Sequence, residues 1–351
     1  MSRYYKLIIS NITRETNKAV SITFDVPENL KETFKFKAGQ YLSIKTKINN
    51  EELRRDYSIC SSRLSGELKV TVKEVEDGTF SVFANTKLKV GDTLEVAPPN
   101  GRFIFQPDAL KTRTVAAFAA GSGITPIMSI AKTLFEEEPN SKFILVYGNK
   151  TPQDTIFFQE ILDLHHKYLE RFELHEVFSQ SEKPNALFGR IEKSTVDFIV
   201  MSEYKDIDID AFYICGPEGM IETVQQVLDE HEVEKERVFY ELFKSSETGI
   251  SGVNSDVNGE TNIKVIVDDE EASFSMKQTD TILEATLAED IDAPHSCKGG
   301  ICSSCIARVT EGKAEMRQNN ILTDSEIAEG LILTCQAQPT TVSITIDYDD
   351  V

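Results

Sequence analysis

Alternation of apolar and polar residues dominates the first hundred positions of the chain. It occurs in short runs rich in β-branched and aromatic residues, separated by Asn, Gly and Pro. A period of two places every second side chain on one buried face, so the pattern predicts short antiparallel strands that form a β-barrel. The predicted strands are 5–9, 20–24, 41–45, 54–60, 68–72 and 93–96.

Beyond Thr112 the pattern changes to apolar runs that alternate with amphipathic stretches of helical period. This alternation predicts a doubly wound α/β domain, in which ligands bind beyond the carboxyl ends of parallel strands. The predicted strands are 114–119, 143–147, 172–178 and 211–214, and the predicted helices are 127–135, 158–166 and 218–231.

A third block follows a polar stretch, 245–260, whose Gly, Ser and Asn content predicts a flexible tether. Its pattern predicts a small mixed sheet with one packed helix, which Thr281 or Asp280 would cap. The predicted strands are 263–267, 272–276, 306–309, 331–334 and 343–346, and the helices are 282–288 and 324–329. The 351 residues therefore divide into predicted domains 1–107, 108–244 and 262–351, with 245–261 as linker.

Four cysteines in the last block carry the most specific chemistry of the chain: Cys297, Cys302, Cys305 and Cys335. Four residues separate the first two and two separate the next pair, which is the plant-type ligand spacing for a two-iron, two-sulfur cluster. A zinc site, a disulfide pair and buried structural thiols are the alternatives. Zinc sites usually show two paired knuckles, whereas this chain has one Cys-x-x-Cys pair and a distant cysteine, so the spacing favours the cluster.

The remaining cysteines, Cys60 and Cys215, leave no disulfide framework to find, which fits a reducing compartment. We expect no signal peptide, because only a few apolar residues precede Asn11. We also expect no membrane span, because the longest apolar run, 115–120, is far shorter than roughly 20 residues. The predicted location is the cytoplasm.

The net charge of -21 argues against nucleic acid or an anionic membrane as a partner. The charge is uneven, since residues 262–351 hold 17 Asp and Glu against 6 Lys and Arg. Two explanations stay open. The charge could serve solubility alone, or it could steer an acidic domain onto a basic redox partner.

The predicted strand 54–60 holds residues that suit a flavin. The Arg55 guanidinium can clamp a pyrophosphate, and Tyr57, two positions on, faces the same side and can lie against a flat ring. Arg and Tyr are common on exposed strands, so this feature is weak by itself. Downstream, Gly78 to Ser81 predicts a helix start whose N–H groups and Ser81 hydroxyl could bind phosphate; a Ser-capped helix without a ligand is the alternative.

Two loops at the carboxyl ends of predicted parallel strands suit a dinucleotide. Gly121 and Gly123 follow the first strand and open a helix, where backbone N–H groups and the helix dipole favour a pyrophosphate. The fingerprint is incomplete, because Pro126 stands where the third glycine would be. The second loop begins at Cys215, whose small thiol could sit beside a nicotinamide, although such a cysteine is more often a buried packing residue.

These motifs occur in the order seen in ferredoxin–NADP reductase-type oxidoreductases with a fused plant-type ferredoxin, which the chain resembles over nearly its whole length. Within that superfamily it is most similar to reductase components of phenylacetyl-CoA epoxidases. The resemblance rests on Arg55-Asp56-Tyr57-Ser58, Gly78-Thr79-Phe80-Ser81, Gly121 to Pro126, Tyr213 to Pro217 and Cys297 to Gly300. It implies a flavin barrel, a nucleotide-binding domain and a β-grasp ferredoxin domain.

The resemblance also implies roles for individual residues. Arg55, Gly78 and Ser81 would hold the FAD phosphates, Tyr57 and Ser58 would flank the isoalloxazine, and Phe243 would pack near it. Cys215 and Gly216 would lie beside the nicotinamide, so that Tyr57, Ser58 and Cys215 act at the reacting rings. The dinucleotide itself would bind at Gly121, Gly123, Thr125 and Pro126.

The motifs distinguish poorly between NADPH and NADH. Relatives that prefer NADP often show Ser-Arg after the third strand of this sheet, whereas this chain has Ser179-Gln180. A 2′-phosphate would then need another cation, and Lys150 and Arg190 are the candidates. We therefore expect NADPH, with NADH as the alternative.

Together these features predict a reductase that takes hydride from NAD(P)H onto FAD and passes single electrons through a [2Fe-2S] cluster to an oxygenase. The resemblance implies the di-iron phenylacetyl-CoA epoxidase, a multi-subunit enzyme, as that acceptor. Related reductases serve Rieske dioxygenases, hydroxylases or desaturases with the same parts. A ferredoxin-like carrier whose first two domains no longer bind nucleotides is the non-enzymatic alternative.

Overall fold

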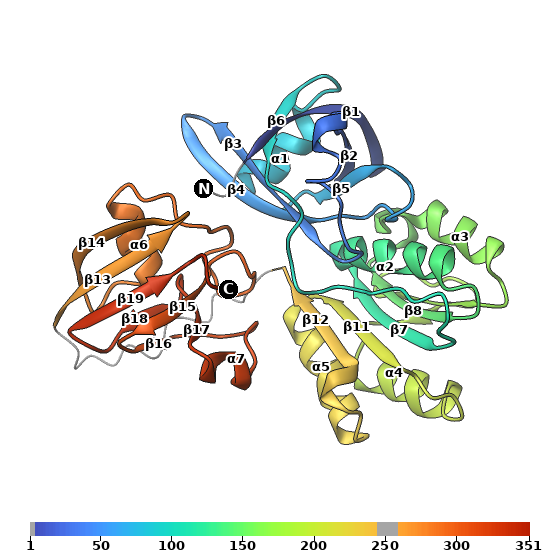
Figure 1. Cartoon of the computed structure of the whole chain (residues 1–351). Helices are drawn as coiled ribbons and strands as arrows, with labels where there is room; N and C mark the ends of the chain where they lie inside the picture. Colours follow the sequence, from blue (N-terminus) through green and yellow to red (C-terminus); the bar gives the residue numbers. More distant parts are fainter. Residues whose placement is uncertain (1–3, 244–258) are drawn as a thin grey trace. The chain divides into compact units, whose positions relative to one another are not determined.

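A computed structural model describes residues 4–243 and 259–351 (Figure 1). The chain divides into two compact units, which are described separately. The larger unit holds residues 5–53 and 57–243. Of the described residues, the smaller unit holds residue 4, residues 54–56 and residues 259–351. Most of the predicted linker, 245–258, lies outside the described residues.

The first sheet confirms the predicted antiparallel barrel. Its six strands have the order β4-β3-β6-β1-β2-β5. The chain closes this sheet beyond β4, because Ile59 forms a bridge to Val70 of β5 and the Cys60 N–H donates to the Lys69 carbonyl at 2.9 Å. The elements are β1 (Tyr5–Thr16), β2 (Ala19–Asp25), β3 (Tyr41–Ile48), β4 (Glu51–Ser58), β5 (Leu68–Lys73), α1 (Thr79–Thr86) and β6 (Thr93–Val96).

The second sheet is parallel throughout and confirms the doubly wound domain. Its order is β10-β9-β8-β7-β11-β12, so the strand order reverses at β7. Figure 1 shows α2 and α3 on one face of this sheet and α4 and α5 on the other. The elements are β7 (Thr114–Ala120), α2 (Ile124–Glu137), β8 (Lys142–Asn149), α3 (Phe158–Lys167), β9 (Phe172–Phe178), β10 (Leu187–Phe188), α4 (Lys193–Asp197), β11 (Ala211–Gly216), α5 (Glu218–Glu230) and β12 (Val238–Leu242).

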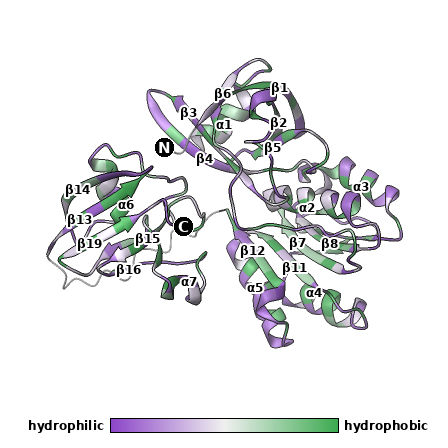
Figure 2. Cartoon of the chain, in the orientation of Figure 1, coloured by the Kyte–Doolittle hydropathy of each residue, from purple (hydrophilic) through white to green (hydrophobic). Residues whose placement is uncertain are grey.

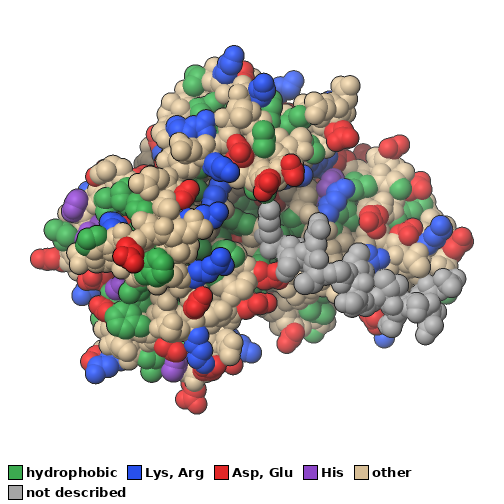
Figure 3. Space-filling model, turned by 180° about the vertical axis from the view of Figure 1, so that it is seen from behind, with side chains coloured by type: hydrophobic (Ala, Val, Ile, Leu, Met, Phe, Trp, Pro, Cys, Tyr) green, Lys and Arg blue, Asp and Glu red, His purple; other side chains and the backbone are tan. Residues whose placement is uncertain are grey.

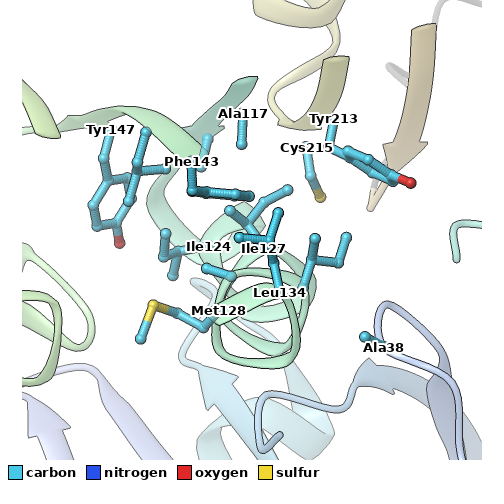
Figure 4. Packing of buried hydrophobic residues seen from close by; sticks show 14 of the residues in the cluster. Ala38, Ala117, Ile124, Ile127, Met128, Leu134, Phe143, Tyr147, Tyr213 and Cys215 are labelled. Atoms are coloured by element: carbon cyan, nitrogen blue, oxygen red, sulfur yellow. The ribbon is translucent and has the colours of Figure 1, made fainter. Parts of the chain in front are cut away.

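Helix α2 is the most deeply buried helix of this domain. Eleven of its 14 residues are buried, and its side chains pack against β7, β8 and β11. Figure 4 shows Ile124, Ile127 and Leu134 of this cluster near Cys215 and Tyr213 of β11. The outer helices α3 and α5 carry both hydrophobic and hydrophilic residues in Figure 2, as expected for helices with one face toward a sheet.

The C-terminal unit is a mixed sheet with one packed helix, as predicted. Its order is β14-β13-β19-β15-β17, with β13 and β19 parallel and the other pairs antiparallel. Thr281 caps α6 through a capping box with Glu284. The elements are β13 (Glu260–Val267), β14 (Glu270–Lys277), α6 (Ile282–Ala288), β15 (Ile306–Glu311), β16 (Ala314–Met316), α7 (Asp324–Ala328), β17 (Leu331–Leu333), β18 (Ala337–Pro339) and β19 (Ser343–Asp347).

The last two residues of the predicted linker belong to a strand, and the predicted domain bounds themselves stay predictions. Strand β13 begins at Glu260, which pairs with Lys277. Thr261 is fully buried, and its hydroxyl donates to the Thr341 carbonyl at 2.6 Å. A partner 80 residues away therefore orders a segment whose local composition is that of a tether.

Charged side chains of both signs are interspersed on the face of the molecule drawn in Figure 3. This face favours neither of the two explanations for the acidic balance, which are solubility and docking onto a basic redox partner. Among the described residues, none of the helices is long and apolar enough to cross a membrane.

Candidate functional site

Three of the predicted flavin residues, Arg55, Tyr57 and Ser58, lie on β4. Arg55 is exposed, and its Nη1 donates to the Arg54 carbonyl at 2.7 Å. Tyr57 is half-buried, with its ring centroid 5.4 Å from that of Phe80 and the two planes inclined at 34°. Packing thus holds one side of the tyrosine ring. Binding of a phosphate by the exposed Arg55 guanidinium stays a prediction.

Gly78 and Ser81 shape the turn that leads into α1. Gly78 is the N-cap residue, and a Cβ on it would lie 2.3 Å from the Ser81 Oγ and 3.0 Å from the Val75 carbonyl oxygen. The Ser81 Oγ accepts from the Val75 N–H at 3.1 Å, so Ser81 does not cap the helix. The turn therefore needs a glycine at position 78, and the Ser81 hydroxyl stabilises it through its hydrogen bond with Val75. Phosphate binding at this turn stays a prediction.

The two glycine loops meet where the strand order reverses. Gly121 and Gly123 form a 3₁₀ turn after β7, and Gly216 ends the neighbouring strand β11. A Cβ on Gly123 would lie 2.0 Å from the Cys215 carbonyl oxygen, so the two loops touch. Crevices at such reversals are where doubly wound sheets bind dinucleotides.

Gly123 and Gly121 serve different purposes in that turn. Gly123 permits close packing of helix against strand, a role that the sequence did not reveal. Gly121 has a φ of 54°, a conformation that favours glycine, and its carbonyl accepts from the Tyr147 hydroxyl at 3.0 Å. Thr125 is buried and donates to the Ser122 carbonyl at 3.0 Å, while Pro126 lies in the first turn of α2. Their contacts with a dinucleotide stay predictions.

A carboxylate that the sequence analysis missed joins Ser58 to Cys215. The Ser58 hydroxyl donates to Glu241 Oε2 at 3.3 Å, and Glu241 is the register partner of Cys215 across β11 and β12. Burial raises the pKa of the Cys215 thiol, and the Glu241 carboxylate raises it further. The three side chains come from strands 4, 11 and 12, so no local pattern could have connected them.

Cys215 is fully buried within the core cluster of the α/β domain. Its burial matches the alternative of a packing residue, and its role beside a nicotinamide stays a prediction. Phe243 follows β12 directly and is 37% exposed, so its ring is available to a ligand.

A second missed residue is Lys73, the last residue of β5. Its Nζ lies 3.1 Å from where a Cβ on Gly121 would be, which places a cation beside the first glycine of the loop. Burial lowers the pKa of Lys73, the nearby Asp154 raises it, and Lys150 and Lys18 lower it. The only sequence feature available was a lysine at the end of a strand that alternates apolar and polar residues. The loop that Lys73 approaches follows a strand of the second sheet.

The residues predicted to choose the nucleotide follow three strands: Lys150 follows β8, Ser179 follows β9 and Arg190 follows β10. Ser179 follows β9, and its N–H donates to the Asn149 carbonyl at 3.0 Å. Lys150 and Arg190 are both exposed. The charge of Lys150 lowers the pKa of Lys73, so these two cations lie near each other at this end of the sheet.

The four predicted cluster ligands form two pairs of adjacent thiols. Cys297 lies beside Cys302, and Cys305 lies beside Cys335. The hydrogen bond from Cys302 lowers the pKa of Cys297 to about 6, and the hydrogen bond from Cys305 lowers that of Cys335. These pairs fit a two-iron cluster, in which each iron takes two protein ligands.

The loop around these thiols supplies hydrogen bonds to sulfur. The Gly299 N–H donates to the Cys297 Sγ at 3.3 Å, and the Gln336 side chain donates to the Cys335 Sγ at 3.8 Å. Gly300 has a φ of 71° and lets the backbone turn inward. In the described part of the chain, no group of three or more His, Cys, Asp or Glu side chains is arranged so that it could hold a single metal ion.

Family models match the chain in three consecutive segments. An oxidoreductase FAD-binding domain matches residues 6–105, an oxidoreductase NAD-binding domain matches 118–226, and a 2Fe-2S iron-sulfur cluster binding domain matches 265–340. Fold and site together therefore define a flavin- and iron–sulfur-containing oxidoreductase.

Individual relatives narrow this class. The chain is 38% identical to one of the subunits of 1,2-phenylacetyl-CoA epoxidase from Escherichia coli (strain K12), over 99% of both chains. It is 32% identical to the ferredoxin reductase component of 3-ketosteroid-9-alpha-monooxygenase from Rhodococcus rhodochrous, over 99% of this chain and 97% of the other. The structure of phthalate dioxygenase reductase matches with a TM-score of 0.60 at 23% identity, over 98% of each chain.

The chain belongs to the family of oxygenase reductase components. It is a reductase with an FAD-binding, an NAD-binding and a 2Fe-2S domain. The comparisons confirm the predicted family, the predicted fold class and the predicted oxidoreductase function. The relatives of the chain serve several different oxygenases.

Proposed function

We propose that this chain is the NAD(P)H-dependent reductase component of a multi-subunit, di-iron phenylacetyl-CoA epoxidase. The observation that carries the proposal is the 38% identity to a component of such an epoxidase over 99% of both chains. A match of this length includes the ferredoxin domain, which must recognise the acceptor, and not only the shared flavin and nucleotide modules.

Each domain has a defined task in this proposal. When bound, FAD accepts hydride from a nicotinamide and releases electrons singly to a [2Fe-2S] cluster. Arg55 and the Gly78 turn hold the FAD phosphates, and Tyr57 flanks the flavin ring. The loop from Gly121 to Pro126 binds the dinucleotide. The four cysteines Cys297, Cys302, Cys305 and Cys335 hold the cluster.

Ser58, Cys215 and Glu241 orient the reacting rings. The hydrogen bond from Ser58 to Glu241 fixes the hydroxyl at the end of β4, next to the residues assigned to the flavin. The small buried Cys215 leaves room for a flat ring above β11. Direct hydride transfer would need the two rings to be held in place and water to be excluded, and these side chains would do both without forming covalent bonds.

NADPH is the proposed nucleotide. Lys73 lies beside the loop that would receive it, Lys150 is close enough to lower the pKa of Lys73, and Arg190 is an exposed cation after β10. Lys73 suits the pyrophosphate, because it lies beside Gly121, whereas Lys150 and Arg190 suit the 2′-phosphate. Lys150→Met and Arg190→Met should each raise the KM for NADPH more than the KM for NADH; equal effects on both would contradict this assignment.

The first test uses the purified full-length protein. We expect a flavin spectrum and a cluster spectrum, both of which bleach on anaerobic addition of NADPH. A red-brown protein without flavin that ignores both nucleotides would support the carrier alternative instead.

The acceptor is tested by reconstitution. The chain should support epoxidation of phenylacetyl-CoA by the oxygenase subunits of a phenylacetyl-CoA epoxidase, with the product followed by mass spectrometry. A Rieske oxygenase supplied with its own substrate is the matched control acceptor. Faster turnover with the control would overturn the choice of acceptor and leave the reductase activity intact.

A further inference from the structure

Helix α2 connects the nucleotide loop to the strand assigned to the flavin. The helix begins at Ile124, directly after the glycine turn, and its other turns lie against residues 60–63, which follow β4. These residues come shortly after Tyr57 and Ser58. The contact therefore joins the two ligand sites over a short path through the larger unit.

Two side chains of α2 make this connection. The Ser129 hydroxyl donates to the Ser61 carbonyl at 2.8 Å, and both residues are at most 1% exposed. The Lys132 Nζ donates to the Cys60 carbonyl at 3.1 Å and pairs with Glu160 of α3 at 2.6 Å. The spacing of three places both side chains on one face of the helix.

The acceptor segment is itself fixed to the flavin barrel. The Cys60 N–H donates to the Lys69 carbonyl at 2.9 Å, and the Cys60 thiol donates to the same carbonyl at 3.3 Å. Arg63, at the far end of the segment, donates from Nε to Glu137 of α2 at 2.9 Å. The segment thus has anchors on both the barrel and the helix, and it can transmit position from one to the other.

A largely buried lysine such as Lys132 is unusual at an interface whose only role is stability. Its side chain is 11% exposed, and burying an ammonium costs free energy unless directed partners satisfy it. Apolar contacts would stabilise the interface without fixing its register, whereas hydrogen bonds to two backbone carbonyls define where along the strand the helix sits. Ser129 lies about 7 to 8 Å along the helix from Ile124, so a shift there moves the nucleotide loop as well.

We propose that Ser129 and Lys132 are positioning residues for hydride transfer, which hold the nucleotide loop of α2 at a fixed distance from the flavin-binding strand β4. The proposal rests on the proposed function, because it assigns the flavin to β4 and the nicotinamide nucleotide to the start of α2. In that transfer a hydride leaves C4 of the reduced nicotinamide, which is oxidised, and reaches N5 of the flavin, which is reduced.

The test is stopped-flow reduction of the FAD in the full-length holoprotein by NADPH. Lys132→Met keeps the length of the side chain and removes its charge, and Ser129→Ala removes one hydroxyl. Because a misplacement of about 1 Å can slow a reaction roughly 100-fold, we expect each variant to lower the limiting rate constant at least about 10-fold. The Kd for NADPH should stay within about 2-fold, since the binding loop itself is unchanged.

Three further measurements distinguish positioning from a merely structural role. The charge-transfer absorbance between nicotinamide and flavin should weaken in Lys132→Met, and Lys132→Arg should restore part of the rate constant. The electron paramagnetic resonance signal of the reduced cluster should not change. The matched control is Lys193→Met, which removes an exposed ion pair with Glu230 elsewhere in the same domain and should leave the rate constant unchanged.

A rate constant within about 2-fold of wild type in both variants would overturn the proposal, even with lowered thermal stability. A weakened Kd at unchanged limiting rate would overturn it too. If Lys132→Met does not fold, Ser129→Ala decides alone, because it changes the volume of the interface very little. Failure of wild type to reduce its flavin with either nucleotide would instead refute the proposed function.

Discussion

The predicted cluster loop and the predicted nucleotide site of this reductase, called the crevice below, are built in opposite ways. Three of the four cluster thiols lie within nine residues, and only Cys335 comes from a distant segment. The crevice brings together Ser58 and Glu241, which lie 183 residues apart, and adds Gly123 and Cys215 from two further elements. A local motif therefore defines the first site, and the order of strands defines the second.

This difference predicts how each site fails. Loss of a thiolate should remove one cofactor and leave the larger unit intact, because Cys305 and Cys335 pack within the core of the C-terminal unit itself. Changes in the crevice should alter distances between elements, because its residues act through backbone contacts and hydrogen bonds. The substitutions below test this contrast in order of decreasing effect.

The largest effect is expected from Cys335→Ser. The hydroxyl is a poor ligand for iron, so the cluster should be lost and the reduction of cytochrome c, a one-electron acceptor, should stop. Hydride transfer to FAD should persist at the wild-type rate. A normal cluster signal in electron paramagnetic resonance would contradict the ligand assignment, and loss of flavin reduction would contradict the independence of the two sites.

Glu241→Ala should have the next largest effect. It removes the acceptor of the Ser58 hydroxyl, so the groups beside the reacting rings lose a fixed orientation. The rate constant of flavin reduction by NADPH should fall about 100-fold in stopped-flow measurements. Glu234→Ala, at an exposed position shortly before β12, is the control and should leave the rate constant unchanged.

Gly123→Ala should destabilise the larger unit. The added methyl group would lie 2.0 Å from the Cys215 carbonyl oxygen, so the backbone of one loop must shift. We expect a loss of about 1–3 kcal/mol in the free energy of unfolding, measured by urea denaturation through flavin fluorescence.

The matched control is Gly219→Ala in α5, where nothing lies within 4 Å of the added Cβ. It should stabilise the same transition by roughly 0.5–1 kcal/mol, because alanine favours a helix over glycine. Equal effects of the two substitutions would show that the contact between the glycine turn and β11 carries no stability.

Lys73→Met should have the smallest effect. The KM for NADPH should rise about 5-fold, or ~1 kcal/mol, through loss of one partly buried cation near the phosphates, with little change in kcat. Lys142→Met, at the amino end of β8, is the control because it removes a lysine from the opposite end of the sheet.

The pH dependence of the KM for NADPH gives a second readout for Lys73. Burial lowers the pKa of Lys73. As the pH rises, Lys73 therefore loses its charge at a lower pH than an ordinary lysine does. The KM of the wild type should rise over the pH range in which Lys73 loses its charge, and the KM of Lys73→Met should not.

The sequence by itself determined the elements and the local motifs of this protein. Periods of two and 3.6 residues predicted the barrel strands and the helices α2, α3 and α5, although β1 runs to Thr16, well beyond its predicted end at Ile9, and α2 begins at Ile124 instead of Ile127. The spacing of Cys297, Cys302 and Cys305 specified a cluster without reference to the fold, because three ligands from one loop need only local geometry.

Tertiary structure decided the contacts that join these elements. The partner of Ser58, the cation beside Gly121 and the need for a glycine at position 123 all depend on which strands are neighbours. The same is true of Thr261, where a distant hydrogen bond orders residues whose composition is that of a linker. The periodicity of a chain indicates the secondary structure of each segment and which of its faces is buried. A site at a reversal of strand order forms only when segments far apart in the sequence come together.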